Sequence, residues 1–343
     1  MSAGEYDAVL VVSFGGPERA EDVVPFLENV VRGRGVPRER LLKVAEHYYE
    51  FGGRSPINDQ NRSLIAALRE ELDARGPRLP IYFGNRNWHP LLADTLKAMT
   101  RDGVERALAF VTSAFSSYSG CRQYRENIDE AIKAAGDGAP RVDKIRPFFN
   151  HPGFIRSMVG RVRAVLSQFD ASDRAGARLL FTAHSIPSSM AHTCDYVAQL
   201  HEASRVVSEE IGSDNWELAF QSRSGPPTQP WLEPDICDRI DTLAAEGVTH
   251  ICAVPIGFLS DHIEVAHDLD SEAAARAVAA GITFVRAGTV GACPVFVSAV
   301  RDLIQERVER GSERACLGTL PARPHECPAD CCPRPQRPRQ AAR

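Results

Sequence analysis

The sequence of 343 residues has no apolar run approaching the ~18 residues of a membrane-spanning helix. Its first residues, MSAGEYDAVLVV, lack the basic stretch and the cleavage site of a signal peptide. Net charge is also small, with 40 Lys and Arg against 45 Asp and Glu, which argues against a nucleic-acid partner. These absences predict a cytoplasmic protein without membrane or nucleic-acid partners, and we expect a monomer.

The composition is typical of a folded protein, with 43% hydrophobic and 25% charged residues. A chain of this length favours two domains of ordinary size. Nine cysteines in a cytoplasmic chain argue against a disulfide framework. Cys252 stands inside an apolar run, as expected of an inert buried thiol. Four others lie near the C-terminus: Cys316, Cys327, Cys331 and Cys332.

Eight short apolar runs predict β-strands at 8–14, 79–84, 107–112, 142–149, 178–184, 217–222, 250–258 and 282–287. The strongest runs have no polar alternation, which is typical of parallel strands covered on both faces. Helical patterns such as 125–135 and 235–247 separate them, and Gly247 is a suitable C-cap for the second. This alternation predicts an α/β fold with parallel sheets.

Four strands precede residue 150 and four follow it. We therefore expect two doubly wound domains, 1–150 and 151–315, each with a four-stranded parallel sheet flanked by helices. There is no convincing internal sequence repeat, so any symmetry would be structural. Residues 316–343 are rich in Cys, Pro and Arg, and this tail is expected to form no core of its own.

Unusual polar loops follow most of the predicted strands. They read GGPE (15–18), NRNWHP (85–90), SAFSSYSGCRQY (113–124), HSIP (184–187), SRSGPPTQPW (222–231) and SDHIEVAHD (260–268). Ligands of open α/β sheets bind beyond the carboxyl ends of the strands. The loops therefore predict a binding cleft between the two domains.

Residues 261–270 hold four carboxylates and two histidines directly after an apolar run. Acids favour a helix N-terminus, so a solvated helix start is one interpretation. At α-helical spacing Asp261, Glu264 and Asp268 share a face, which would suit a path for a cation. His262 lies off that face unless the helix widens locally into a π-helix. Spacing alone does not decide between the two interpretations.

His184 ends the strand predicted at 178–184. A lone histidine is more often structural than functional. Glu264 is expected at the tip of a neighbouring strand, however, and imidazole with carboxylate binds a divalent metal or exchanges protons near neutral pH.

Six ordered motifs make the sequence resemble the ferrochelatases from about residue 7 to 310: VVSFGGPE, GGRSPIN, TSAFSSYSGC, FTAHSIP, FQSRSGPPTQPWLEP and VPIGFLSDHIEVAHDLD. The actinobacterial coproporphyrin III type, with its C-terminal iron–sulfur motif, is the most similar. The resemblance implies two Rossmann-like domains around a porphyrin cleft, into which ferrous iron is inserted. It also implies that His184 and Glu264 are the catalytic pair that meets the iron, with Asp268 on a metal path.

This chemistry suits the residues. Two protons must leave the porphyrin nitrogens, which requires a base of near-neutral pKa. Carboxylates can replace the water that iron sheds. Apolar walls from Phe14, Trp231 and Phe258 are expected to bend the macrocycle and expose its nitrogen lone pairs. Some relatives have a tyrosine at the position of Phe14 that ligates iron, which Phe14 cannot do.

The region 30–41 carries four arginines, among them Arg32 and Arg34, where membrane-associated relatives have an apolar lip. Guanidinium groups pair well with propionates, so coproporphyrin III is the expected substrate and protoporphyrin IX the alternative. A solvated basic turn, the alternative interpretation, would give the same sequence pattern. The resemblance adds substrate contacts at Ser55 and Tyr124.

The tail motif CPADCCP brings Cys327, Cys331 and Cys332 within six residues. The resemblance implies a 2Fe–2S cluster bound by these three and Cys121, with Cys316 as a substitute ligand. Accidental clustering and a zinc site are the alternatives.

Other functions fit less well. A cobalt chelatase of the sirohydrochlorin type would use paired histidines, whereas this sequence offers His184 with a glutamate. A solute-binding protein would have an export signal. A haem carrier needs an axial ligand but no row of acids such as Asp261, Glu264 and Asp268.

Overall fold

The computed structural model describes residues 6–225, 228–309 and 311–335. Two four-stranded sheets with parallel strands organise it. The first has the order β2-β1-β3-β4, from β1 (Ala8–Ser13), β2 (Ile81–Asn85), β3 (Arg106–Val111) and β4 (Arg141–Lys144). The second has the order β6-β5-β7-β8, from β5 (Arg178–His184), β6 (Trp216–Gln221), β7 (His250–Val254) and β8 (Thr283–Arg286). The two orders are equivalent, and the predicted α/β fold is confirmed.

Two of the predicted strands are four residues shorter than expected. The strand predicted at 142–149 ends at Lys144, because Arg146 turns inward and forms a buried ion pair with Glu306 (Nε–Oε2, 2.8 Å). The strand predicted at 250–258 ends at Val254, directly before Pro255, which has no N–H for a ladder. Apolar character alone overestimated both strands.

Helices cover both sheets. In the first half they are α1 (Val23–Val30), α2 (Arg38–Glu50), α3 (Ile57–Arg75), α4 (Leu92–Arg101) and α5 (Gln123–Ala135). In the second half they are α6 (Pro152–Leu166), α7 (Ala171–Gly176), α8 (Ser188–Ala191), α9 (Tyr196–Ile211), α10 (Ile236–Ala245), α11 (Ile263–Val265), α12 (Ala274–Ala279) and α13 (Pro294–Val308). Two segments are π-helical, η2 (Tyr118–Arg122) and η3 (Ala266–Ala273). Gly247, with φ +84°, follows α10 as predicted.

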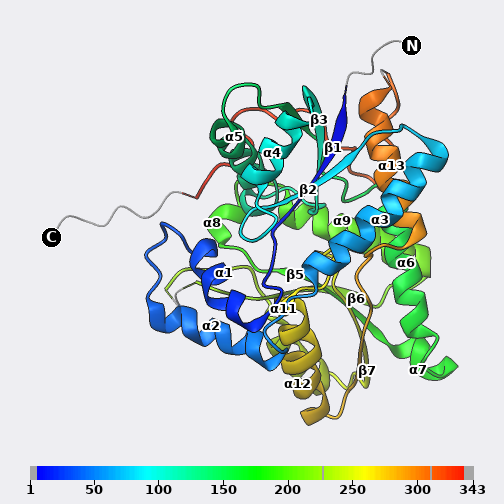
Figure 1. Cartoon of the computed structure of the whole chain (residues 1–343). Coiled ribbons are helices and arrows are strands. Elements are labelled where there is room, and N and C mark those ends of the chain that lie inside the picture. The colour runs from blue at the N-terminus through cyan, green and yellow to red at the C-terminus, as the bar shows by residue number, and fades with distance from the viewer. Residues whose placement is uncertain (1–5, 226–227, 310, 336–343) are drawn as a thin grey trace.

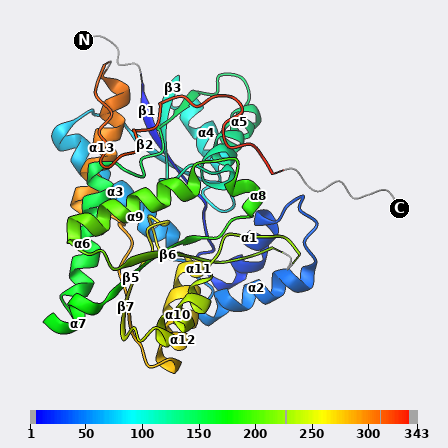
Figure 2. The same ribbon diagram turned by 180° about the vertical axis from the view of Figure 1, so that it is seen from behind.

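The two halves share one apolar core. It contains Val11 and Phe110 of the first sheet, Phe181 of the second, and Phe154 and Phe296 between them. Helix α13 packs against both α3 and α6, so the last helix ties the halves together. Figures 1 and 2 show α1 and α2 beside the second half, and Ile263 of α11 packs into their apolar cluster.

The tail after α13, described to residue 335, has no helix or strand in that part. It runs past α5, as both views show (Figures 1 and 2). Asn150 holds it at two points: its carbonyl accepts from Leu317 N (2.9 Å) and its Nδ2 donates to Leu320 O (2.7 Å).

Within the described residues, every helix is too short or too polar to cross a membrane.

Candidate functional site

His184 and Glu264 face each other at the carboxyl ends of two adjacent strands. His184 is the last residue of β5, and Glu264 follows β7 in α11, with 3.6 Å between His184 Nε2 and Glu264 Oε2. His184 Nδ1 bonds to the carbonyl of Ser185, which can only accept, so Nδ1 carries the proton. Nε2 therefore keeps its lone pair. The two side chains are 34% and 47% exposed. A proton that reaches Nε2 can therefore pass to the neighbouring Glu264 carboxylate and from there to solvent.

Asp268 lies on η3, four residues after Glu264. Ser222 Oγ donates to its Oδ2, and Gln221 Nε2 donates to the same oxygen at 3.3 Å. Ser222 adopts the left-handed conformation (φ +62°), a strained backbone typical of functional sites. Burial raises the pKa of Asp268 despite the hydrogen bond from Ser222.

The helical-face prediction for residues 261–268 was wrong for Asp261. The helix begins at Ile263, so Asp261 stands in the preceding loop and pairs with Arg286 (3.0 Å). Asp270 pairs with the same arginine (2.6 Å). His262 occupies the N-cap position without a side-chain capping bond, and its Nδ1 lies 3.9 Å from Glu264 Oε2, although the π-helical widening starts only at Ala266.

Helix α2 contributes groups that the sequence reasoning missed. His47 stacks on His267 with ring centroids 3.9 Å apart, and Glu50 Oε2 lies 3.7 Å from His267 Nε2. His267, Asp268 and Glu272 place potential ligand atoms within 4.8 Å of one another. The HYYE segment (47–50), one residue before the GGRSPIN motif, was the available signal. We call Glu264, Asp268 and Glu272 the acidic row.

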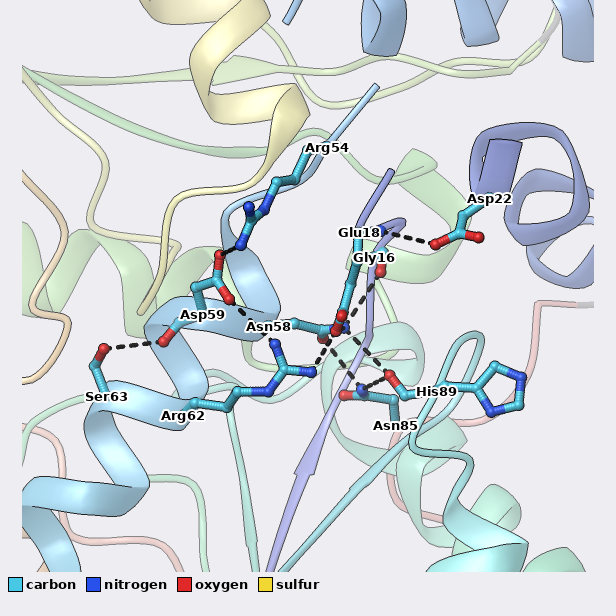
Figure 3. Close-up of polar contacts among 10 residues, drawn as sticks. All are labelled: Gly16, Glu18, Asp22, Arg54, Asn58, Asp59, Arg62, Ser63, Asn85 and His89. Carbon is cyan, nitrogen blue, oxygen red and sulfur yellow. Dashed lines mark hydrogen bonds and ion pairs between the residues drawn. The ribbon is translucent and has the colours of Figure 1, made fainter. Parts of the chain in front are cut away.

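A polar network fixes the turn after β1 (Figure 3). Asn58 Nδ2 donates to Gly16 O (3.3 Å) and to Glu18 Oε1 (2.9 Å), and Asn85 Nδ2 donates to Asn58 Oδ1 (3.1 Å). A Cβ at Gly16 would lie 2.7 Å from Cβ of Ser55, so this position requires glycine. Ser55 is thereby buried beneath the turn at 3% exposure.

Arg86, another missed residue, joins two of the predicted substrate contacts. Its guanidinium carbon lies 4.5 Å from the ring centroid of Tyr124 and 5.5 Å from that of Phe14. Tyr124 is buried, which raises its pKa, while the charge of Arg86 opposes the shift. The signal was present, because Arg86 belongs to the polar loop NRNWHP.

The remaining predicted substrate contacts are spread around the same strand ends. Phe258 packs edge-on against His262 (5.0 Å between centroids), and Trp231 forms an isolated bridge with Pro187. Arg32 and Arg34 are exposed on the loop between α1 and α2. The structure thus gathers these residues from both halves, on separate loops.

Four cysteines line a cavity of about 280 Å³ between the tail and α5: Cys121, Cys327, Cys331 and Cys332. The Sγ atoms of Cys331 and Cys332 are 3.5 Å apart, and Cys332 has φ +50°. Burial and the neighbouring thiols raise the pKa of Cys327. Cys316 is exposed and does not line the cavity. We call Cys121, Cys327, Cys331 and Cys332 the four-cysteine site.

A family model described as Ferrochelatase matches residues 6–308. A Rhodopirellula baltica protein named ferrochelatase is 55% identical, over 95% of this chain and 93% of that protein. A Streptomyces griseus protein named coproporphyrin III ferrochelatase is 51% identical, over 96% of this chain and 93% of that protein. The cobalt complex of a Bacillus subtilis sirohydrochlorin chelatase has a TM-score of 0.52 over 89% of this chain and 96% of that chain. At 10% identity, that likeness shows the fold alone.

Proposed function

Because this chain belongs to the ferrochelatase family, we propose that it inserts ferrous iron into coproporphyrin III and releases the iron porphyrin. The observation that carries the proposal is the His184–Glu264 pair at the ends of β5 and β7, continued by the acidic row. Its relatives named coproporphyrin III ferrochelatase match it over nearly their full length.

His184 acts as the base. The proton on Nδ1 leaves Nε2 free to take a proton from a pyrrole nitrogen, and Glu264 stands 3.6 Å away to receive it. Two protons leave for each Fe²⁺ that enters, so the site must relay protons repeatedly. The exposure of Glu264 opens this relay to solvent.

Iron approaches along the acidic row. Carboxylate oxygens and imidazole replace the water that the cation loses. Ser222 and Gln221 hold Asp268 at Oδ2, and its Oδ1 lies 3.3 Å from His267 Nδ1, so the carboxylate keeps one orientation. His267, with Glu50 and Glu272 nearby, would form the outer end of the path.

Phe14, Trp231 and Phe258 would wall the macrocycle, and Arg32, Arg34, Ser55 and Tyr124 would recognise its propionates. The burial of Ser55 and Tyr124 favours indirect roles for them, through the Gly16 turn and through Arg86. Arginines on the α1–α2 loop suit four propionates better than two. The loop therefore favours coproporphyrin III, and protoporphyrin IX is the alternative substrate.

The four-cysteine site fits a 2Fe–2S cluster. Such clusters take four thiolates, and here four thiols converge on one cavity. Burial, and then the neighbouring thiols, raise the pKa of Cys327 and of Cys332, a cost that bound iron would relieve. The strained turn at Cys332 directs two adjacent thiols into one cavity. When bound, the cluster supplies a redox-active centre and a cross-link between tail and body.

We further propose a monomer whose domains meet near residue 150, with the porphyrin cleft between them. A sedimentation measurement would test the monomer.

Anaerobic incubation with ferrous iron and either coproporphyrin III or protoporphyrin IX, followed by absorbance, tests the function. Faster conversion of coproporphyrin III is expected. Preference for protoporphyrin IX would overturn the substrate assignment, and inactivity with both would overturn the proposed function.

A further inference from the structure

The tail brings an arginine to a cationic group formed by distant segments. Arg334 lies just past the four-cysteine site, and its Nε donates to the hydroxyl of Tyr118 (2.6 Å). Its guanidinium carbon also lies 5.5 Å from the centroid of the Tyr118 ring. Arg86 Nη1 donates to the carbonyl of Ser119, the next residue (3.4 Å). The π-helical turn η2 is therefore contacted by both Arg334 and Arg86.

Arg34 reaches the same place from the α1–α2 loop. Although Arg34 is exposed to solvent, desolvation by the atoms around it, Arg86 and Arg334 lower its pKa, while the Tyr118 hydroxyl opposes them. Among the described residues, no carboxylate contributes to this balance. The charges of Arg86 and Arg334 therefore both act on Arg34, and an anion bound among these arginines would offset them.

The carboxylate nearest to this group belongs to Glu126. Its Oε2 accepts from Tyr118 (2.9 Å) and lies 3.4 Å from Arg334 Nη2, while its Oε1 pairs with Arg122 (3.2 Å). Since Arg122 already pairs with Glu126, the charge of Arg334 is only partly balanced. Arg86 Nε is buried and has no hydrogen-bond partner within the described part of the chain, which points to a missing acceptor.

We propose that Arg334, together with Arg34 and Arg86, binds a propionate of the porphyrin, so that the tail contributes directly to substrate binding. This inference rests on the proposed function. Arg86 connects the group to the substrate, because its guanidinium also lies over Phe14, the expected wall of the macrocycle. A carboxylate accepts hydrogen bonds from several guanidinium groups and would relieve their repulsion. The four-cysteine site, by fixing the tail, would then position Arg334.

The test measures binding of metal-free coproporphyrin III by fluorescence, without iron, so turnover plays no part. Arg334→Gln removes the charge, and Arg334→Lys keeps it. Arg323→Gln is the matched control, because Arg323 is also a tail arginine but pairs with Asp195 (2.7 Å), away from this group. The visible absorbance of each variant reports whether its tail has kept the same structure around the four-cysteine site.

We expect Arg334→Gln to raise the Kd about three- to fivefold, as suits an exposed ion pair, with absorbance unchanged. Arg334→Lys should recover part of the affinity, and Arg323→Gln should bind like the wild type. An unchanged Kd in Arg334→Gln would overturn the inference. A change shared with Arg323→Gln or accompanied by altered absorbance would also overturn it, because Arg334 would then act on tail structure. Wild-type protein that does not bind coproporphyrin III would overturn the proposed function itself.

Discussion

Glu202 fastens the tail to helix α9, and its replacement by Gln should loosen that attachment measurably. Its Oε1 accepts from Leu320 N (3.0 Å), Thr319 Oγ1 (2.9 Å) and Thr319 N. Its Oε2 pairs with Arg205 (2.9 Å). Gln keeps the shape of the side chain but removes the charge that strengthens all four contacts.

The magnitude follows from the pKa. Burial alone would raise the pKa of Glu202, but Arg205 and the tail donors outweigh it and hold the value at about 2. Relative to an unfolded value of about 4.3, two units at ~1.4 kcal/mol each give about 3 kcal/mol. Solvent screening on the Arg205 side reduces this to about 2 kcal/mol. Because the folded pKa is lowered, the contribution is complete above about pH 4.3 and is lost as pH falls towards 2.

Hydrogen exchange of the tail amides, read by mass spectrometry on peptides covering 315–323, measures this local opening. At pH 7, Glu202→Gln should lower protection about 30-fold, as ~2 kcal/mol implies, and the difference from wild type should shrink below pH 4. Glu209→Gln is the control, because Glu209 pairs with the same Arg205 but is 59% exposed. It should change protection by less than about 0.5 kcal/mol. Equal effects of the two variants, or a difference independent of pH, would refute the reasoning.

Three further variants test the site. His184→Ala should abolish iron insertion in the absorbance assay while porphyrin still binds by fluorescence; wild-type turnover would remove His184 from the mechanism. Asp268→Asn should raise the iron concentration for half-maximal rate several-fold. Because the pKa of Asp268 is raised, the wild-type requirement should also rise as pH falls through that value, and an Asn variant with the same pH response would argue against the path. Cys121→Ser should remove the visible absorbance and the acid-labile sulfide, and it should expose the tail to protease. Full retention of the absorbance and the sulfide would exclude Cys121 as a ligand.

The sheets could be predicted because buried parallel strands have a clear signature in the sequence. Runs such as AVLVVS and RLLFTAH have an apolar centre without polar alternation, and both are strands in the structure. Strand ends were less predictable, since apolar character continues past the last ladder hydrogen bond. Beyond Lys144 the chain stays apolar, but the buried Arg146–Glu306 pair determines its course. That pair joins residues 160 positions apart, which no local pattern indicates.

The site was predictable where chemistry sits on strand ends and less so where it depends on packing. His184 and Glu264 end up together because β5 and β7 are neighbours. Arg86 was missed because its role comes from two aromatic rings, Phe14 and Tyr124, in other segments. Helix α2 was missed for the same reason, since His47 gains meaning only from its stacking on His267.

The acids of residues 261–272 show what a sequence pattern leaves undecided. Helical spacing alone groups Asp261 with Glu264 and Asp268, yet within the described residues the acids divide into two groups by their partners. Asp261 and Asp270 both pair with Arg286, so their charges are neutralised and anchor the segment to β8. The acidic row pairs instead with the histidines His184, His262 and His267. Imidazole nitrogens can bind metal ions and exchange protons, whereas arginine stays charged and binds no metal, so only the second group is suited to passing cations or protons. The pairs with Arg286 therefore anchor the segment, while the acidic row stays available to bind cations or transfer protons.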